Sequence, residues 1–231
     1  NAKVINVESK SFFISGAGGS IGAEITRQLL SSNPLTIILF ELSEYNLFNI
    51  ERECLAIKDS KNLDTEIIPI LGDIRDRSNL EHVFQKFSID QIYHAAAYKH
   101  VPIVENENNI SKAAENNILG TYNLANSAVK HGVHSFVMIS TDKAVRPTNI
   151  MGATKRFAEI IIQSINSEAS NTKFSMVRFG NVINSSGSVI PLFIDQISRG
   201  GPITVTNKNV MRYFMTIPEA SNLVLQAGEM S

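Results

Sequence analysis

The order of apolar and polar residues along the chain predicts alternating strands and helices. Six short runs, rich in β-branched and aromatic residues and bounded by turn-forming residues, are typical of buried strands. They cover residues 12–15, 35–40, 67–71, 91–94, 136–140 and 174–179. Because these runs are continuously apolar rather than alternating, they indicate a parallel sheet that is covered on both faces.

The segments between these runs have the spacing of amphipathic helices. Ile21, Ile25 and Leu29 recur every four residues, and longer helical patterns cover 113–130 and 153–165. Strands joined by right-handed crossover helices build a doubly wound sheet, whose ligands bind over the carboxyl ends of the strands. We therefore expect an α/β fold of the Rossmann type.

A glycine-rich turn follows the first predicted strand and precedes a helix. It reads GAGGSIG and contains Gly16, Gly19, Ser20, Ile21 and Gly22. A tight turn, close approach of the backbone to a pyrophosphate and close helix packing each exclude a Cβ, while the helix start attracts phosphate. Strand, turn and helix in this order predict a dinucleotide-binding site formed by these residues.

Glu41 ends the second predicted strand. It lies about 20 residues beyond the last glycine, where an acidic side chain accepts hydrogen bonds from the ribose hydroxyls of the adenosine. A carboxylate there repels a 2′-phosphate, so NAD is favoured over NADP. Ser43 follows closely and is expected to shape the same pocket.

Two further segments are expected to contact the cofactor. Asp73 and Ile74 follow the third predicted strand, where Asp73 can meet the adenine edge or cap the next helix, and the two roles are compatible. Ala95, Ala96 and Ala97 follow the fourth strand. Their small side chains either let the backbone lie against the cofactor or serve close helix packing.

The chain length of 231 residues fits a single catalytic domain. We expect residues 1–177 to form the dinucleotide-binding core. After this point Gly, Pro, Ser and Asn mark loops, so 178–231 is expected to begin a substrate-binding portion. A helical pattern over 217–230 stops without a capping signal, which indicates that this portion is truncated.

The fifth strand and the next helix bring a set of reactive side chains to the same crevice. Thr141, Asp142 and Lys143 end the strand, and Met151 and Lys155 begin the helix. This arrangement resembles the extended short-chain dehydrogenase/reductases, which pair a Ser or Thr on the fifth strand with Tyr-x-x-x-Lys on the helix. Lys155 matches the lysine, whereas Met151 stands at the tyrosine position.

Four longer segments narrow the resemblance. They are FELSEYNL at 40–47, HAAAYKHVP at 94–102, STDKAVR at 140–146 and VRFGNV at 177–182. Together they resemble the membrane-anchored UDP-N-acetylglucosamine 4,6-dehydratases of polysaccharide biosynthesis, a branch with methionine at the tyrosine position. The resemblance implies UDP-N-acetylglucosamine as substrate, a homo-oligomer of two or more chains, and a location at the cytoplasmic face of the inner membrane. Contact with the membrane would come only through a transmembrane region absent from this chain.

The resemblance also implies a redox-neutral reaction. The hexose is oxidised at C4 with NAD, loses the C5 proton and the C6 hydroxyl as water, and regains the hydride at C6, with retention at C5. Asp142 is assigned as the acid for the hydroxyl, Lys143 as the base at C5, Thr141 as a partner of the sugar O4, and Lys155 as a ligand of the nicotinamide ribose. A thioether takes no proton at neutral pH, so Met151 cannot be the base for C4 oxidation. Thr141 relaying to water and Asp142 acting twice both remain open.

Five residues are assigned to the substrate side, mainly by the same resemblance. They are Lys99, His100, Asn117, Asn181 and Arg212. Asn117 matches a helix asparagine that orders the active-site backbone, and the planar guanidinium of Arg212 suits a phosphate. Two other functions remain open: a 4-epimerase or reductase on the same fold, and a sensor that binds NAD or a nucleotide sugar without turnover.

Composition excludes several classes of partner. The formal net charge of −1 gives no general attraction to nucleic acid. The single cysteine, Cys54, permits no intramolecular disulfide. The five histidines have no metal-ligand spacing, so no metal is predicted.

Overall fold

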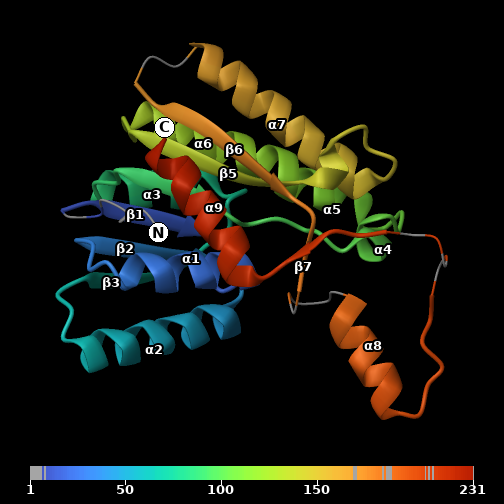
Figure 1. Cartoon of the computed structure of the whole chain (residues 1–231). Coiled ribbons are helices and arrows are strands. Elements are labelled where there is room, and N and C mark those ends of the chain that lie inside the picture. The colour runs from blue at the N-terminus through green and yellow to red at the C-terminus, as the bar shows by residue number, and fades with distance from the viewer. Residues whose placement is uncertain are drawn as a thin grey trace.

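The computed structural model is built around a six-stranded parallel sheet (Figure 1). It describes residues 7, 9–168, 171–183, 185, 189–205, 207, 209 and 211–230. The strands are β1 (Ser11–Ser15), β2 (Thr36–Glu41), β3 (Glu66–Leu71), β4 (Gln91–His94), β5 (Ser135–Thr141) and β6 (Lys173–Phe179), in the order β3-β2-β1-β4-β5-β6. This is the predicted doubly wound fold of the Rossmann type. The strand order reverses between β1 and β4, where such folds bind their ligands.

Helices cover both faces of the sheet. One face carries α1 (Ser20–Leu30), α2 (Glu44–Lys61) and α9 (Ile217–Glu229), and the other carries α3 (Arg77–Lys86), α6 (Thr121–Lys130) and α7 (Ile150–Glu168). Successive strand residues serve opposite faces, so Phe12 packs with the first set of helices and Phe13 with the second. The strands β1 and β2 are therefore buried along their whole length.

The helix predicted over 113–130 is not one regular helix. The chain forms α5 (Ile110–Ala114), a π-helical turn over Glu115–Gly120 and then α6. Asn117 lies in the π-helical turn and is fully engaged: its amide donates to the Tyr98 carbonyl and to the Thr154 hydroxyl, and its oxygen accepts from the Tyr98 amide. The buried Asn117 side chain thus ties this turn to the Tyr98 backbone and to Thr154 of α7 at the point where the helical hydrogen bonding changes.

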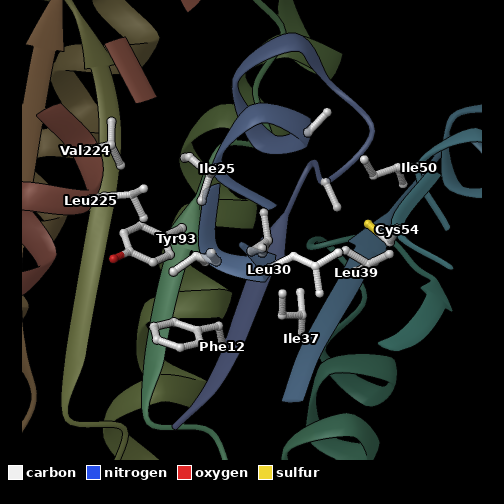
Figure 2. Close-up of a cluster of buried hydrophobic side chains, with 14 of the residues drawn as sticks. Phe12, Ile25, Leu30, Ile37, Leu39, Ile50, Cys54, Tyr93, Val224 and Leu225 are labelled. Atoms are coloured by element: carbon white, nitrogen blue, oxygen red, sulfur yellow. The ribbon is translucent and has the colours of Figure 1, made fainter. Parts of the chain in front are cut away.

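The chain after β6 leaves the sheet and returns to it. A short strand β7 (Asn181–Val182), helix α8 (Val189–Ser198) and strand β8 (Phe214–Met215) come first, and β7 pairs with β8. In Figure 1, α8 stands apart from the layered body, whereas α9 lies beside α1. Val224 and Leu225 of α9 join the cluster that contains Phe12, Ile25 and Tyr93 (Figure 2). Residues beyond 178 therefore complete the core as well as one wall of the site.

None of the helices in the described part of the chain combines the length and the apolar character needed to cross a membrane.

Candidate active site

The glycine-rich turn occupies the crevice between β1 and β4. Gly16 has a φ of +68°, and a Cβ on it would lie 2.7 Å from the amide nitrogen of Ala96. A Cβ on Gly22 would collide with the Gly16 carbonyl oxygen. No side chain caps α1 at its N-cap residue, Gly19, so the partial positive charge of this helix end faces the turn. The geometry suits a pyrophosphate, as the sequence predicts.

Glu41 ties the strand end to the glycine turn. Its side chain is buried, its Oε2 accepts the amide of Gly18 at 2.9 Å, and its Oε1 accepts the amide of Ser43 at 3.0 Å. A carboxylate has about four lone-pair sites, so ribose hydroxyls can still bind it. Ser43 itself does not line the cavity: its hydroxyl accepts the amide of Asn46 and caps α2.

A cavity of about 170 Å³ lies beside Glu41. The predicted residues that line it are Gly16, Gly19, Glu41, Asp73, Ile74, Ala95, Ala96 and Ala97. The Asp73 carboxylate also receives the backbone amide and the guanidinium of Arg75, and the side-chain hydrogen bond from Arg75 holds its pKa below the usual range. The helix that follows is capped by Asp76 instead.

A larger cavity of about 340 Å³ adjoins the first and shares Gly16, Gly19, Ala95 and Ala97 with it. Thr141, Lys143, Met151 and Lys155 all line it, as do Ser20, Ile21 and Gly22. The predicted reactive residues and the glycine turn therefore meet in one groove over the carboxyl ends of the strands.

Met151 and Lys155 lie one turn apart on the same face of α7. Met151 is buried against Val104 and Ala113 and also faces the cavity. Burial lowers the pKa of Lys155 to about 8, although the charge of Glu159 acts to raise it. Lys155 therefore stays largely protonated near neutral pH but can be discharged within one or two pH units.

The sequence led us to expect that the side chains of Asp142 and Lys143 both point into the cavity, but only one of them does. Lys143 lines it, whereas the Asp142 side chain does not and is 53% exposed. The Asp142 Oδ1 accepts the Thr141 hydroxyl at 3.0 Å and the Lys143 ammonium at 3.1 Å. Burial raises the pKa of Asp142, but hydrogen bonds from Lys143 and Thr141 outweigh it, so the pKa is lower than usual. Asp142 is ionised at neutral pH.

Three of the five substrate-side residues line the larger cavity, and the other two do not. Lys99 and His100 line it. Asn181 lines it too, and its side-chain oxygen accepts the Lys143 ammonium at 3.4 Å. Asn117 lies outside the lining and instead orders the backbone at Tyr98. Arg212 is exposed, lies outside the lining and donates to the Met211 carbonyl, so the structure does not bring it into the site.

Sequence reasoning missed two walls of the groove. Around the larger cavity the missed residues are Ile139, Ser140, Phe179, Gly180, Val182, Ser185, Val189 and Phe214; around the smaller one they are Phe40, Leu42, Asn46, Gly72, Tyr98 and Asn116. Phe214 reaches the site through the pairing of β8 with β7, which joins distant segments that share no sequence pattern. Gly180, by contrast, lies in a segment that carried the family resemblance.

The charge of the larger cavity favours an anionic ligand. Its described lining includes Lys99, His100, Lys143 and Lys155 but no Asp or Glu. Burial lowers the pKa of Lys99, and burial together with Lys99 lowers the pKa of His100. Among the described residues, no three His, Cys, Asp or Glu side chains gather where they could hold a metal ion.

The chain is similar in sequence to known proteins of polysaccharide biosynthesis. A family model described as polysaccharide biosynthesis protein matches residues 12–231. The chain belongs to this family. The capsular polysaccharide biosynthesis protein CapD of Staphylococcus aureus is 50% identical to this chain over 223 residues, which is 96% of this chain and 36% of CapD. The chain thus spans about a third of the length of this relative.

Two further comparisons are with proteins of more similar length. The UDP-N-acetylglucosamine 4,6-dehydratase (inverting) of Campylobacter jejuni is 33% identical over 224 residues, 95% of this chain and 64% of that protein. The X-ray structure of Pen from Bacillus thuringiensis superimposes on this chain with a TM-score of 0.87 and a sequence identity of 37%. The match covers 97% of this chain and 67% of that one.

Proposed function

We propose that this chain is the cofactor-binding and reactive part of an NAD-dependent UDP-N-acetylglucosamine 4,6-dehydratase that serves polysaccharide biosynthesis. The observation that carries the proposal is the single groove in which Thr141, Lys143 and Lys155 meet the glycine turn. In the full-length protein we place this part at the cytoplasmic face of the inner membrane.

The cofactor is NAD. Gly16 and Gly22 have no space for a Cβ, so only their backbone would face a pyrophosphate. The Glu41 carboxylate is placed to accept hydrogen bonds from the adenosine ribose. Lys155 would hold the nicotinamide ribose. When bound, NAD supplies the hydride exchange between C4 and C6 of the sugar.

The contacts of Thr141 favour one route for the C4 proton, which the sequence left open. The Thr141 hydroxyl already donates to the ionised Asp142 carboxylate. Thr141 can therefore accept the proton of the C4 hydroxyl while passing its own to Asp142. Asp142 is then protonated, which is the form that the next step requires.

Elimination uses both members of the Asp142–Lys143 pair. Once Lys143 has released its own proton to solvent, its amine removes the C5 proton. The protonated Asp142 gives its proton, through the Thr141 hydroxyl that lines the cavity, to the C6 hydroxyl, which leaves as water. Lys143 then returns the proton to C5 after C6 has been reduced. Because one amine serves the same face twice, the configuration at C5 is retained, in contrast to the inverting enzyme named above.

Proton nuclear magnetic resonance tests this proposal on the full-length protein. With UDP-N-acetylglucosamine we expect a new C6 methyl doublet, and coupling constants that report retention at C5. A product epimerised at C4 without the methyl signal would mean an epimerase. Tight binding without any turnover would mean a sensor, and either result would overturn dehydration.

A further inference from the structure

Glu159 is a fully buried carboxylate just outside the groove. It lies on α7 one turn beyond Lys155, has no exposed surface, and is not part of the cavity lining. A buried charge is costly unless it is paired and hydrogen-bonded, so its partners indicate what it does.

Glu159 joins α7 to the two strands that end at the site. Its Oε1 accepts the Ser140 hydroxyl at 2.6 Å and the Arg178 Nε at 2.7 Å, and its Oε2 accepts the Arg178 Nη2 at 2.6 Å. Ser140 and Arg178 are paired neighbours on β5 and β6. The residues that follow them, Thr141 and Phe179, line the cavity.

Glu159 also acts on Lys155 through its charge. Burial raises the pKa of Glu159, but hydrogen bonds from Arg178, Ser140 and Arg156 outweigh it and bring the pKa to about 2, so the carboxylate is ionised. Its negative charge opposes the burial that lowers the pKa of Lys155. The other titratable side chains in the described lining of the cavity are Lys99, His100 and Lys143, and the ionised Asp142 pairs with Lys143. The charge of Lys155 also reaches the buried His94 on β4, whose pKa it helps to lower.

We propose that Glu159 is a positioning residue, whose carboxylate fixes α7 against β5 and β6 and keeps the ammonium group of Lys155 charged where it meets the cofactor. The inference rests on the proposed NAD site but not on dehydration. Glu159 touches neither sugar nor cofactor.

The pH dependence of NAD binding to the full-length protein tests this role, measured by isothermal titration calorimetry. We expect the wild-type affinity to fall as the pH rises through about 8, where Lys155 loses its proton. Glu159→Gln keeps the shape of the side chain and removes its charge. It should move this midpoint down by about one pH unit, which lowers affinity about twofold at about pH 7 and about threefold at about pH 7.5.

Arg178→Gln provides the opposite variant. It removes a cation that neutralises Glu159, so the midpoint should move to higher pH. Arg27→Gln is the matched control. It breaks the ion pair between Arg27 of α1 and Glu53 of α2, outside the cavity lining, and should leave the midpoint unchanged. Because Arg178→Gln retains the carboxylate, it also provides a test if Glu159→Gln does not fold.

Opposite shifts in the two variants support the inference, since general damage to packing would not reverse sign. Equal midpoints in wild type and both variants would overturn it and leave Glu159 a purely structural residue. A protein that binds NAD with the expected shifts but forms no methyl product would overturn the proposed function alone.

Discussion

At the scale of single residues, protonation states decide what the site can do. Asp142 is ionised and accepts the Thr141 hydroxyl, so it can receive a proton before it donates one. Met151 fills space at the position where related enzymes have a tyrosine. In the proposed reaction, the proton transfers therefore depend on three consecutive residues at the end of β5.

Two substitutions should separate the steps of the reaction. Asp142→Asn removes the acceptor of the C4 proton, so both C4 oxidation and product formation should fall by about 10²–10⁴-fold. Lys143→Gln removes only the base at C5, so reduced nicotinamide should accumulate while the methyl signal stays absent. Absorbance of reduced nicotinamide after mixing with the sugar measures the difference. Identical behaviour of the two variants would contradict the assigned roles.

His94 should make stability depend on pH. It is fully buried between the Ser15 and Thr121 hydroxyls. Because the Thr121 hydroxyl donates to the Asn117 carbonyl, it must accept from Nε2 of His94, which fixes the neutral tautomer. Burial, together with the charge of Lys155, lowers the pKa of His94 to about 3.

The sign of this dependence follows from proton uptake. The unfolded chain binds a proton at His94 below about pH 6.5 and the folded chain does not, so stability falls as the pH falls from about 6.5 to 3. Between about pH 7.5 and 4.5 the loss should be about 3 kcal/mol. Urea unfolding of His94→Gln should lack this loss, and the exposed His134→Gln should retain it.

The sequence predicted that these candidate residues meet in one groove, but not the direction of each side chain. The sequence identified Thr141, Lys143 and Lys155 through their spacing after a strand and on a helix. It could not indicate that Asp142 turns toward Lys143 rather than into the cavity, because that depends on the short helical turn over Asp142–Ala144. Glu159 had no local signal, since its partners lie on other strands.

At the scale of elements, the π-helical turn is where local pattern and structure differ. Apolar periodicity predicts where a helix runs but not a local change in its hydrogen bonding, which here depends on the contacts of Asn117 with Tyr98 and Thr154. Strand positions, in contrast, were predicted to within one residue at each end, because runs of apolar and β-branched residues bounded by turn-forming residues are a local signal for buried parallel strands.

Asn117→Ala should test how far this turn depends on its side-chain bonds. The change removes partners of the Tyr98 backbone and of the Thr154 hydroxyl, so we expect a loss of about 2–3 kcal/mol in the free energy of unfolding. Asn126→Ala on α6 removes a single bond to the Tyr122 carbonyl at the surface and should cost less than about 0.5 kcal/mol. Equal losses would mean that the turn does not depend on Asn117.

At the scale of the whole molecule, we expect chains of the predicted homo-oligomer to meet at exposed apolar residues of α6, α7 and the π-helical turn before α6. Leu119 lies in this turn, Tyr122 on α6, and Phe157 and Ile160 on the neighbouring α7; all four are exposed. We expect Phe157→Glu to lower the mass of the full-length protein in analytical ultracentrifugation. Phe48→Glu, on the equally exposed outer face of α2, should not change the mass. An unchanged mass in both variants would contradict this interface.

The return of α9 to the side of α1 has a consequence for how the protein is made. During synthesis, β1, the glycine turn and α1 emerge well before α9, so the layer that covers Tyr93 lacks Val224 and Leu225 until α9 has been translated. Contacts between such distant segments form slowly. The nascent chain must therefore carry an exposed apolar patch at Tyr93 until α9 has been made, a state that a chaperone would recognise.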